Sequence, residues 1–250
     1  MSDRKIVAAV DSSVAGNPVL VTARALARVL GARVEALHVQ GDDDHPPHEA
    51  AAAVGVPLRV VTGPVVERLA EADRAADTVA MVIGARSTPT SPHALGSTAL
   101  AVLSSVTKPV VVVPPVGRIA PRIVRVLVPL EGASDSLAPL SPIEPAESTS
   151  VEVVGLHVGA EEATHDEELL RRYLPSGIES FRLETRTGEH AELVPAVADE
   201  LGCNLIALAW APQVAESREE VFREALRRSP LPIMLVPARL VEGQHGVSAQ

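Results

Sequence analysis

The sequence predicts an α/β fold made of two tandem Rossmann-like domains, each with a five-stranded parallel sheet. Two observations carry this prediction. Runs such as Val79–Ile83 and Val110–Val113 are apolar without interruption, which is typical of parallel strands that helices cover on both faces. Such strands alternate with amphipathic segments of helix length, and the whole series of landmarks occurs twice along the chain.

The first series, residues 1–117, sets out the elements of one domain in order. The expected strands are Lys5–Val10, Val34–Val39, Leu58–Val61, Val79–Ile83 and Val110–Val113. The expected helices are Pro18–Leu30, a short one around His48–Val54, Pro64–Ala76 and one that opens at Gly96. In the first of these helices Leu20, Leu26 and Leu30 recur on one face, and Gly31 is a typical residue for its end.

The second series, residues 122–240, repeats these landmarks in the same order. Val124–Leu130 ending at Glu131 matches the first strand ending at Asp11, and Leu156–Val158 matches Leu37–Val39. The remaining matches are Thr187-Gly188 with Thr62-Gly63, Asn204–Ala209 with the strand before Gly84, and Ile233–Val236 with Val110–Val113. We therefore expect two domains joined by a linker near Gly117–Arg122 and packed with pseudo-two-fold symmetry through their last strands. Residues 241–250 are expected to form a flexible tail.

Composition excludes several classes of function. Aromatic residues make up only 2% of the chain, so base-stacking surfaces for nucleic acid are not expected. The net charge is −10, and residues 121–250 carry all of it. The first domain is therefore expected to repel an anionic ligand less than the second. No apolar run has the length of a membrane span, no signal segment is present, and the single cysteine fits a reducing compartment. We expect a cytoplasmic protein, a monomer or a homodimer, without nucleic-acid or membrane partners.

The stretch from Gly84 to Thr98 carries the chemistry of a binding site. Gly84 ends a buried strand and removes side-chain bulk where a ligand could approach the backbone closely. Gly96, Ser97 and Thr98 then open a helix whose first N–H groups have no intrahelical acceptor, which favours an anion. Open α/β sheets bind nucleotides at such a strand–loop–helix junction.

This stretch resembles the nucleotide motif of the universal stress protein family, which has the form G-x-x-G, nine residues, then G-[ST]. Here it reads Gly84-Ala85-Arg86-Ser87, eight residues, then Gly96-Ser97. Ser87 therefore stands where the family has a second glycine, and the loop is one residue shorter. The resemblance extends over almost the whole chain and is most specific at residues 79–115.

The resemblance implies an adenine nucleotide alpha hydrolase-like fold and a regulatory protein of the stress response that binds ATP in its first domain. Mg²⁺ is an optional companion of the ATP, a metal ligand set is not assigned, and ADP or AMP are alternatives. The nucleotide-binding residues that it implies are Asp11, Ser12, Val39, Ile83, Gly84, Arg86, Ser87, Gly96, Ser97 and Thr98. Among these, Asp11 is expected near the ribose or a phosphate-bound metal, and the Val39 backbone near the adenine.

The second domain is expected to be degenerate. Pro139, Pro142 and Pro145 interrupt its first helix, and no glycine follows Trp210 before the next helix. That helix begins at Glu216, and Ser217 with Glu220 has the spacing of a capping box, which would satisfy the N–H groups that a phosphate needs.

For the other candidate residues a structural role is expected rather than a functional one. His38 and His157 occupy equivalent strand positions and are expected to pack near the edge of a sheet. The run Asp42–His48 mixes metal-ligand types, but its Pro46-Pro47 lacks the spacing of known metal sites. Cys203 is expected to be a structural thiol.

Two alternatives to a nucleotide-binding regulator stay open. One is an interaction module, with an unknown protein partner, that binds no nucleotide. The other is a slow ATPase or self-phosphorylating protein with a serine such as Ser87, Ser91 or Ser97 as acceptor, although no general base is evident nearby and no catalytic residue is assigned.

Overall fold

The computed structural model describes residues 3–13, 16–41, 45–85, 95–115, 118, 120–130, 139, 150–159, 174, 178, 180–210 and 216–237, and of residues 216–220 only the backbone. The chain divides into two compact units. Unit 1 is Met1–Arg122 with Pro230–Pro232, and unit 2 is Ile123–Ser229 with Ile233–Gln250.

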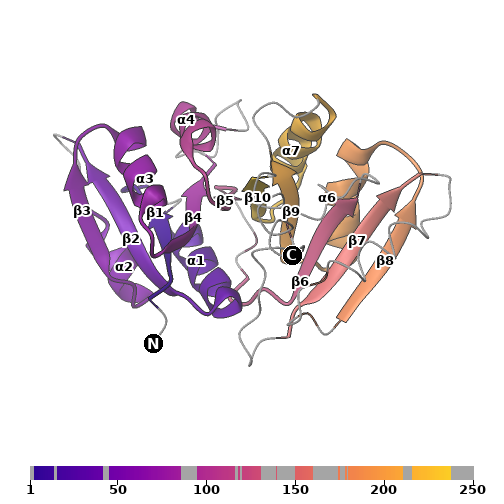
Figure 1. Ribbon diagram of the computed structural model, residues 1–250, viewed down its shortest axis with the longest axis horizontal. Coiled ribbons are helices and arrows are strands. Elements are labelled where there is room, and N and C mark those ends of the chain that lie inside the picture. The colour runs from indigo at the N-terminus through magenta and orange to yellow at the C-terminus, as the bar shows by residue number, and fades with distance from the viewer. Residues whose placement is uncertain are drawn as a thin grey trace, which may run out of the picture. The chain divides into compact units, whose positions relative to one another are not determined.

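Unit 1 is a doubly wound α/β unit with the strand order β3-β2-β1-β4-β5 (Figure 1). Its strands are β1 (Lys5–Ala9), β2 (Arg33–Gln40), β3 (Leu58–Thr62), β4 (Thr78–Gly84) and β5 (Val110–Val113), and every adjacent pair is parallel. Its helices are α1 (Gly16–Leu30), α2 (His48–Ala53), α3 (Val65–Arg74) and α4 (Ser97–Ser105). Helices α1 and α2 pack together, as do α3 and α4.

The core of unit 1 lies around its central strands. Ile6 and Val7 of β1 and Met81 and Val82 of β4 have no exposed surface. Because helices cover both faces, residues that point in opposite directions along these strands are equally buried. The uninterrupted apolar runs in the sequence have this origin.

Unit 2 has the strand order β10-β9-β6-β7-β8, again with parallel pairs. The strands are β6 (Arg125–Leu130), β7 (Glu152–Val158), β8 (Ser180–Arg186), β9 (Leu205–Trp210) and β10 (Ile233–Pro237). The helices α6 (His190–Glu200) and α7 (Glu216–Arg228) pack on each other. The region 131–149, for which three prolines predict a broken helix, lies outside the described residues apart from Pro139.

The predicted fold class is confirmed: the fold is α/β, with five parallel strands in each unit. Helix α3 is shorter than predicted, because Pro64 is its N-cap residue and Arg74 its last. The pseudo-two-fold packing of the two domains stays a prediction. None of the described helices is long and apolar enough to cross a membrane.

Candidate functional site

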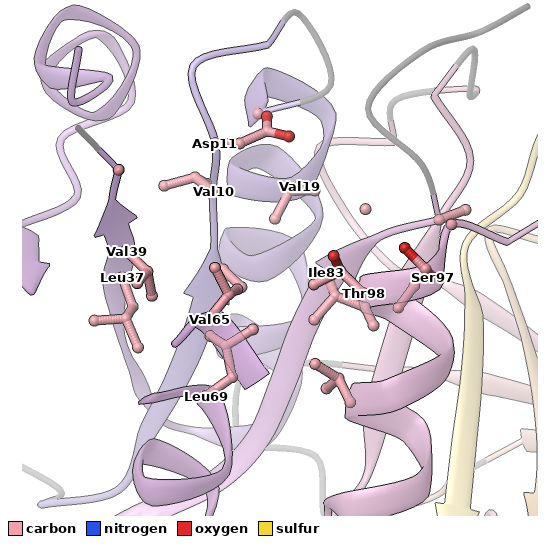
Figure 2. Close-up of a pocket in the computed structure, with 18 residues that line it drawn as sticks. Val10, Asp11, Val19, Leu37, Val39, Val65, Leu69, Ile83, Ser97 and Thr98 are labelled. Carbon is pink, nitrogen blue, oxygen red and sulfur yellow. The ribbon is translucent and has the colours of Figure 1, made fainter. Parts of the chain in front are cut away.

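A cavity of about 490 Å³ opens at the carboxyl ends of the strands of unit 1 (Figure 2). In the strand order of unit 1, β1 is followed by β2 on one side and by β4 on the other. This is the switch point of the sheet, where the loops after the two strands leave toward opposite faces and open a crevice. The lining residues are Ala9, Val10, Asp11, Gly16, Val19, Leu37, Val39, Gly41, Val65, Leu69, Ile83, Gly84, Ala85, Gly96, Ser97, Thr98, Ala99 and Val102.

The amino-terminal end of α4 forms one side of the cavity. Gly96 is the N-cap residue, with φ −76° and ψ 158°, and within the described residues its helix has no side-chain cap. The Gly96 N–H donates to the Ala85 carbonyl oxygen at 2.8 Å, and the helix's first internal bond runs from Leu100 N–H to Gly96 O at 3.1 Å. By helix geometry, the N–H groups of Ser97, Thr98 and Ala99 have no acceptor inside α4. Since all three residues line the cavity, this end of α4 offers N–H groups and a positive helix end to an anion.

The opposite side of the cavity exposes a backbone edge of β2. The Leu37 carbonyl accepts from Val10 N–H at 3.0 Å, so the polar groups of Leu37 face β1. The Ala36 N–H donates to Pro57 O on the other side, toward β3. The backbone N–H and C=O groups of successive residues point to opposite sides of a strand. Those of Val39, two residues after Leu37, therefore also face the β1 side. The pairing of β1 with β2 ends at Ala9, so these two groups of Val39 face the cavity.

Apolar side chains surround this backbone edge. In Figure 2 Leu37 and Val39 lie at the left, with Val65 and Leu69 of α3 beside them, while the hydroxyl groups of Ser97 and Thr98 lie at the right. Leu69 is buried and Val65 is 41% exposed, so Val65 lies at the rim. The cavity thus has an apolar end with one backbone donor and acceptor, and a polar end formed by α4.

Asp11 is the one charged side chain among the described residues that line the cavity. Its Oδ1 accepts a hydrogen bond from Ser13 N–H at 3.0 Å and another from the Ser13 hydroxyl, an arrangement that fixes the carboxylate after β1. Gly16, the first residue of α1, lies close by: a Cβ there would approach Asp11 O to 3.2 Å. A side chain at this position would therefore require the Asp11 backbone to shift by a few tenths of an ångström.

The cavity brings together most of the residues that the sequence singled out. Seven line it, namely Asp11, Val39, Ile83, Gly84, Gly96, Ser97 and Thr98. Ser12 is exposed and is not among the lining residues, and Arg86 and Ser87 lie outside the described residues. Leu37, Val65 and Leu69 also line the cavity and were not predicted, although the i, i+4 spacing of the last two gives one face of a helix.

The corresponding place in unit 2 holds two aromatic rings. In β9, Ala209 pairs with the fourth residue of β10 just as Gly84 pairs with the fourth residue of β5, so Trp210 corresponds to Ala85. Four residues separate helix from strand in both units, which makes Phe222 the counterpart of Ala99. The Trp210 and Phe222 rings pack edge to face, with centroids 5.5 Å apart. Two small cavity-lining residues of unit 1 are therefore replaced in unit 2 by a packed aromatic pair.

The remaining candidates do not form a site in the described part of the chain. His38 is buried on β2, next to the edge strand β3, and its Nδ1 lies 3.0 Å from Val10 O. The described residues hold no group of three or more His, Cys, Asp or Glu side chains suited to a metal ion, and Asp42–Asp44 lie outside them. Cys203 has no exposed surface, and burial raises the pKa of its thiol to about 11, while Arg125 acts in the opposite direction.

Unit 1 is an open α/β unit with a crevice at its switch point, and comparison with known proteins matches part of it to a protein family. Residues 45–114 match the model of the universal stress protein family, so the predicted resemblance is confirmed for this stretch, which runs from α2 to the end of β5. No curated protein matches the chain.

Solved structures share the fold of the chain. A universal stress protein from Archaeoglobus fulgidus DSM 4304 has a TM-score of 0.66 at 17% identity, over 95% of this chain and 99% of its own. A functionally unknown protein from Pseudomonas aeruginosa PAO1 also has a TM-score of 0.66, at 14% identity, over 96% of this chain and 95% of its own. At these identities the likeness concerns the fold alone.

Proposed function

We propose that this chain is a regulatory protein of the stress response that binds one adenine nucleotide, ATP, in the cavity of unit 1. The observation that carries the proposal is the division of the cavity into two chemically different ends. One end is apolar and presents a backbone donor and acceptor at Val39, and the other is the amino-terminal end of α4. A volume of about 490 Å³ lies within the range of small-molecule sites.

Each part of ATP has a counterpart in this arrangement. The adenine ring lies between Leu37, Val65 and Leu69, and its amino group and ring nitrogen pair with the Val39 carbonyl and N–H. The phosphates lie at the N–H groups and hydroxyls of Ser97 and Thr98, where the helix end favours negative charge. Asp11 hydrogen-bonds a ribose hydroxyl, or meets the phosphates through Mg²⁺, since a bare carboxylate would repel them.

Unit 2 binds no nucleotide in this proposal. The Trp210–Phe222 pair occupies positions where unit 1 has only the methyl groups of Ala85 and Ala99. The charge distribution points the same way, because the 21 acidic residues of positions 121–250 outnumber the 11 basic ones, whereas residues 1–120 are neutral.

Calorimetric titration with ATP and Mg²⁺ tests the proposal on the wild type, Gly96→Asp and Leu100→Asp. The backbone of Gly96 lies in the extended region that any residue adopts, and aspartate is a better N-cap than glycine, so Gly96→Asp keeps α4 intact. Its carboxylate takes up N–H groups of the first turn and repels phosphate, so we expect affinity to fall about tenfold to a hundredfold.

Leu100→Asp is the matched control, because Leu100 is 52% exposed on the same helix and does not line the cavity. Its affinity should equal that of the wild type, and the stoichiometry should be one nucleotide per chain. Unchanged binding in Gly96→Asp, or two nucleotides per chain, contradicts the proposed site. A wild type that binds no nucleotide would instead favour the interaction module.

A further inference from the structure

Unit 1 has a second cavity, at the other ends of its strands, whose charged lining is entirely basic. This arginine groove has a volume of about 370 Å³ and is open to solvent. Arg24 and Arg28 of α1 and Arg33 at the start of β2 line it, and no carboxylate is among its lining residues in the described part of the chain. Its floor is apolar and includes Ala27, Val34 and Val56.

The three arginines differ in how they are held. The Arg28 Nη1 donates to Pro121 O at 2.8 Å, which anchors its guanidinium. Arg33 Nη2 lies 3.1 Å from Asp77 Oδ2, and its Nη1 lies 3.8 Å from Glu35 Oε2, so its charge is largely balanced. Arg24 is exposed and forms no ion pair in the described part of the chain. The groove therefore presents one unpaired guanidinium beside an anchored one.

The spacing of Arg24 and Arg28 does not stabilise the helix that carries them. Arg24 and Arg28 stand at i, i+4 on α1, where like charges oppose helix formation. The carbonyl end of α1 offsets part of the repulsion at Arg28, but Arg24 lies a turn farther from that end. Repulsion of this kind between two arginines of one helix is expected where a bound partner supplies the opposite charge.

The shape and chemistry favour a peptide over a small anion. Small ligands are usually enclosed, whereas this groove is open to solvent and combines apolar lining residues with its guanidinium groups. Arginine is enriched at protein interfaces, and its planar fork binds carboxylates in pairs of hydrogen bonds. We propose that the arginine groove binds an acidic segment of a protein partner, with carboxylates at Arg24 and Arg28 and an apolar side chain on the floor between them.

Fluorescence anisotropy of the full chain with a labelled peptide of alternating glutamate and leucine tests this proposal. We expect binding that weakens as salt is added, and about a tenfold loss of affinity in Arg24→Glu. Arg74→Glu is the control, since Arg74 is exposed at the end of α3, outside the groove, and the charge change is the same. Its affinity should change less than about twofold.

Two further probes separate a peptide groove from a simple anion site. A glutamate–serine peptide lacks the apolar side chains and should bind more weakly than the glutamate–leucine peptide. Inorganic phosphate should compete only at concentrations where added chloride competes as well. The proposal is overturned if the wild type does not bind the glutamate–leucine peptide, if Arg24→Glu and Arg74→Glu bind alike, or if either further probe gives the opposite result.

Discussion

The carboxylate of Asp73 fastens α3 to the segment that joins α4 to β5, and replacing it tests whether this junction stabilises unit 1. Asp73 has no exposed surface. Its Oδ2 accepts from Thr107 N–H at 2.8 Å and from the Thr107 hydroxyl at 2.9 Å, and its Oδ1 accepts from Lys108 N–H at 3.3 Å. Lys108 Nζ in turn donates to Ala75 O and Thr78 O.

The expected loss follows from these contacts. A hydrogen bond to a charged group contributes about 1.5–3 kcal/mol, but the three bonds are not additive, and Thr107 is exposed, so water replaces part of what is lost. We expect Asp73→Ala to lower the free energy of unfolding by about 2–4 kcal/mol. Asp73→Asn keeps one acceptor oxygen and should lose about 1–2 kcal/mol.

Urea unfolding followed by far-UV circular dichroism measures the change, with Glu71→Ala as the control. Glu71 lies on the same helix, but its side chain is 55% exposed and, among the described residues, pairs with Arg68 alone. Its removal should therefore change stability by less than about 1 kcal/mol. Because the sole tryptophan, Trp210, belongs to unit 2, its fluorescence follows that unit in the same experiment. Equal losses in Asp73→Ala and Glu71→Ala would refute the reasoning.

Two other predictions concern the cavity and the buried thiol. Ala99→Phe gives unit 1 the side chain that unit 2 has at the corresponding position, Phe222, and places a ring in the cavity. We expect ATP affinity to fall at least about tenfold. Leu100→Phe, on the exposed face of the same helix, should leave the affinity unchanged, and calorimetric titration compares the two variants. Cys203 should resist a thiol reagent at about pH 8 until urea unfolds the chain. The pKa of the thiol is about 11 in the folded chain and 9.0 ordinarily, so the unfolded chain ionises first as pH rises. The free energy of unfolding should therefore fall between about pH 9 and about pH 11, and Cys203→Ala should not show this fall.

The sequence was sufficient for the buried strands β4 and β5 because their signal is local. Burial on both faces requires an uninterrupted apolar run, and β4 and β5 were predicted to within one residue at either end for this reason. Helix ends were less certain, since Pro64 fits both an N-cap and a first-turn position. The edge strand β8 (Ser180–Arg186) has a charged residue at every second position from Arg182 and no apolar run. Only the Thr187-Gly188 landmark after it indicated its place.

The candidate site was predictable only where a motif joins its parts along the chain. Gly84, Gly96 and Ser97 are close in sequence, and a family motif links them. Leu69 reaches the same cavity from α3, and nothing in its own helix indicates which end of the sheet that helix covers. The arginine groove was not predicted, because Arg24 and Arg28 form an ordinary exposed face of a helix, and only the fold brings Arg33 and the apolar lining beside them.

The Trp210–Phe222 pair stabilises unit 2 by a contact that unit 1 does not have. Phe222 is 2% exposed, and an edge-to-face pair contributes about 0.5–1.5 kcal/mol beyond the burial of its area. Unit 1 has Ala85 and Ala99 at these positions and leaves apolar side chains facing an open cavity. The same architecture thus has the more stabilising aromatic pair in unit 2 and two alanines in unit 1. Natural sequences depart from good packing chiefly at functional sites, so the two alanines are themselves an argument that the cavity of unit 1 holds a ligand.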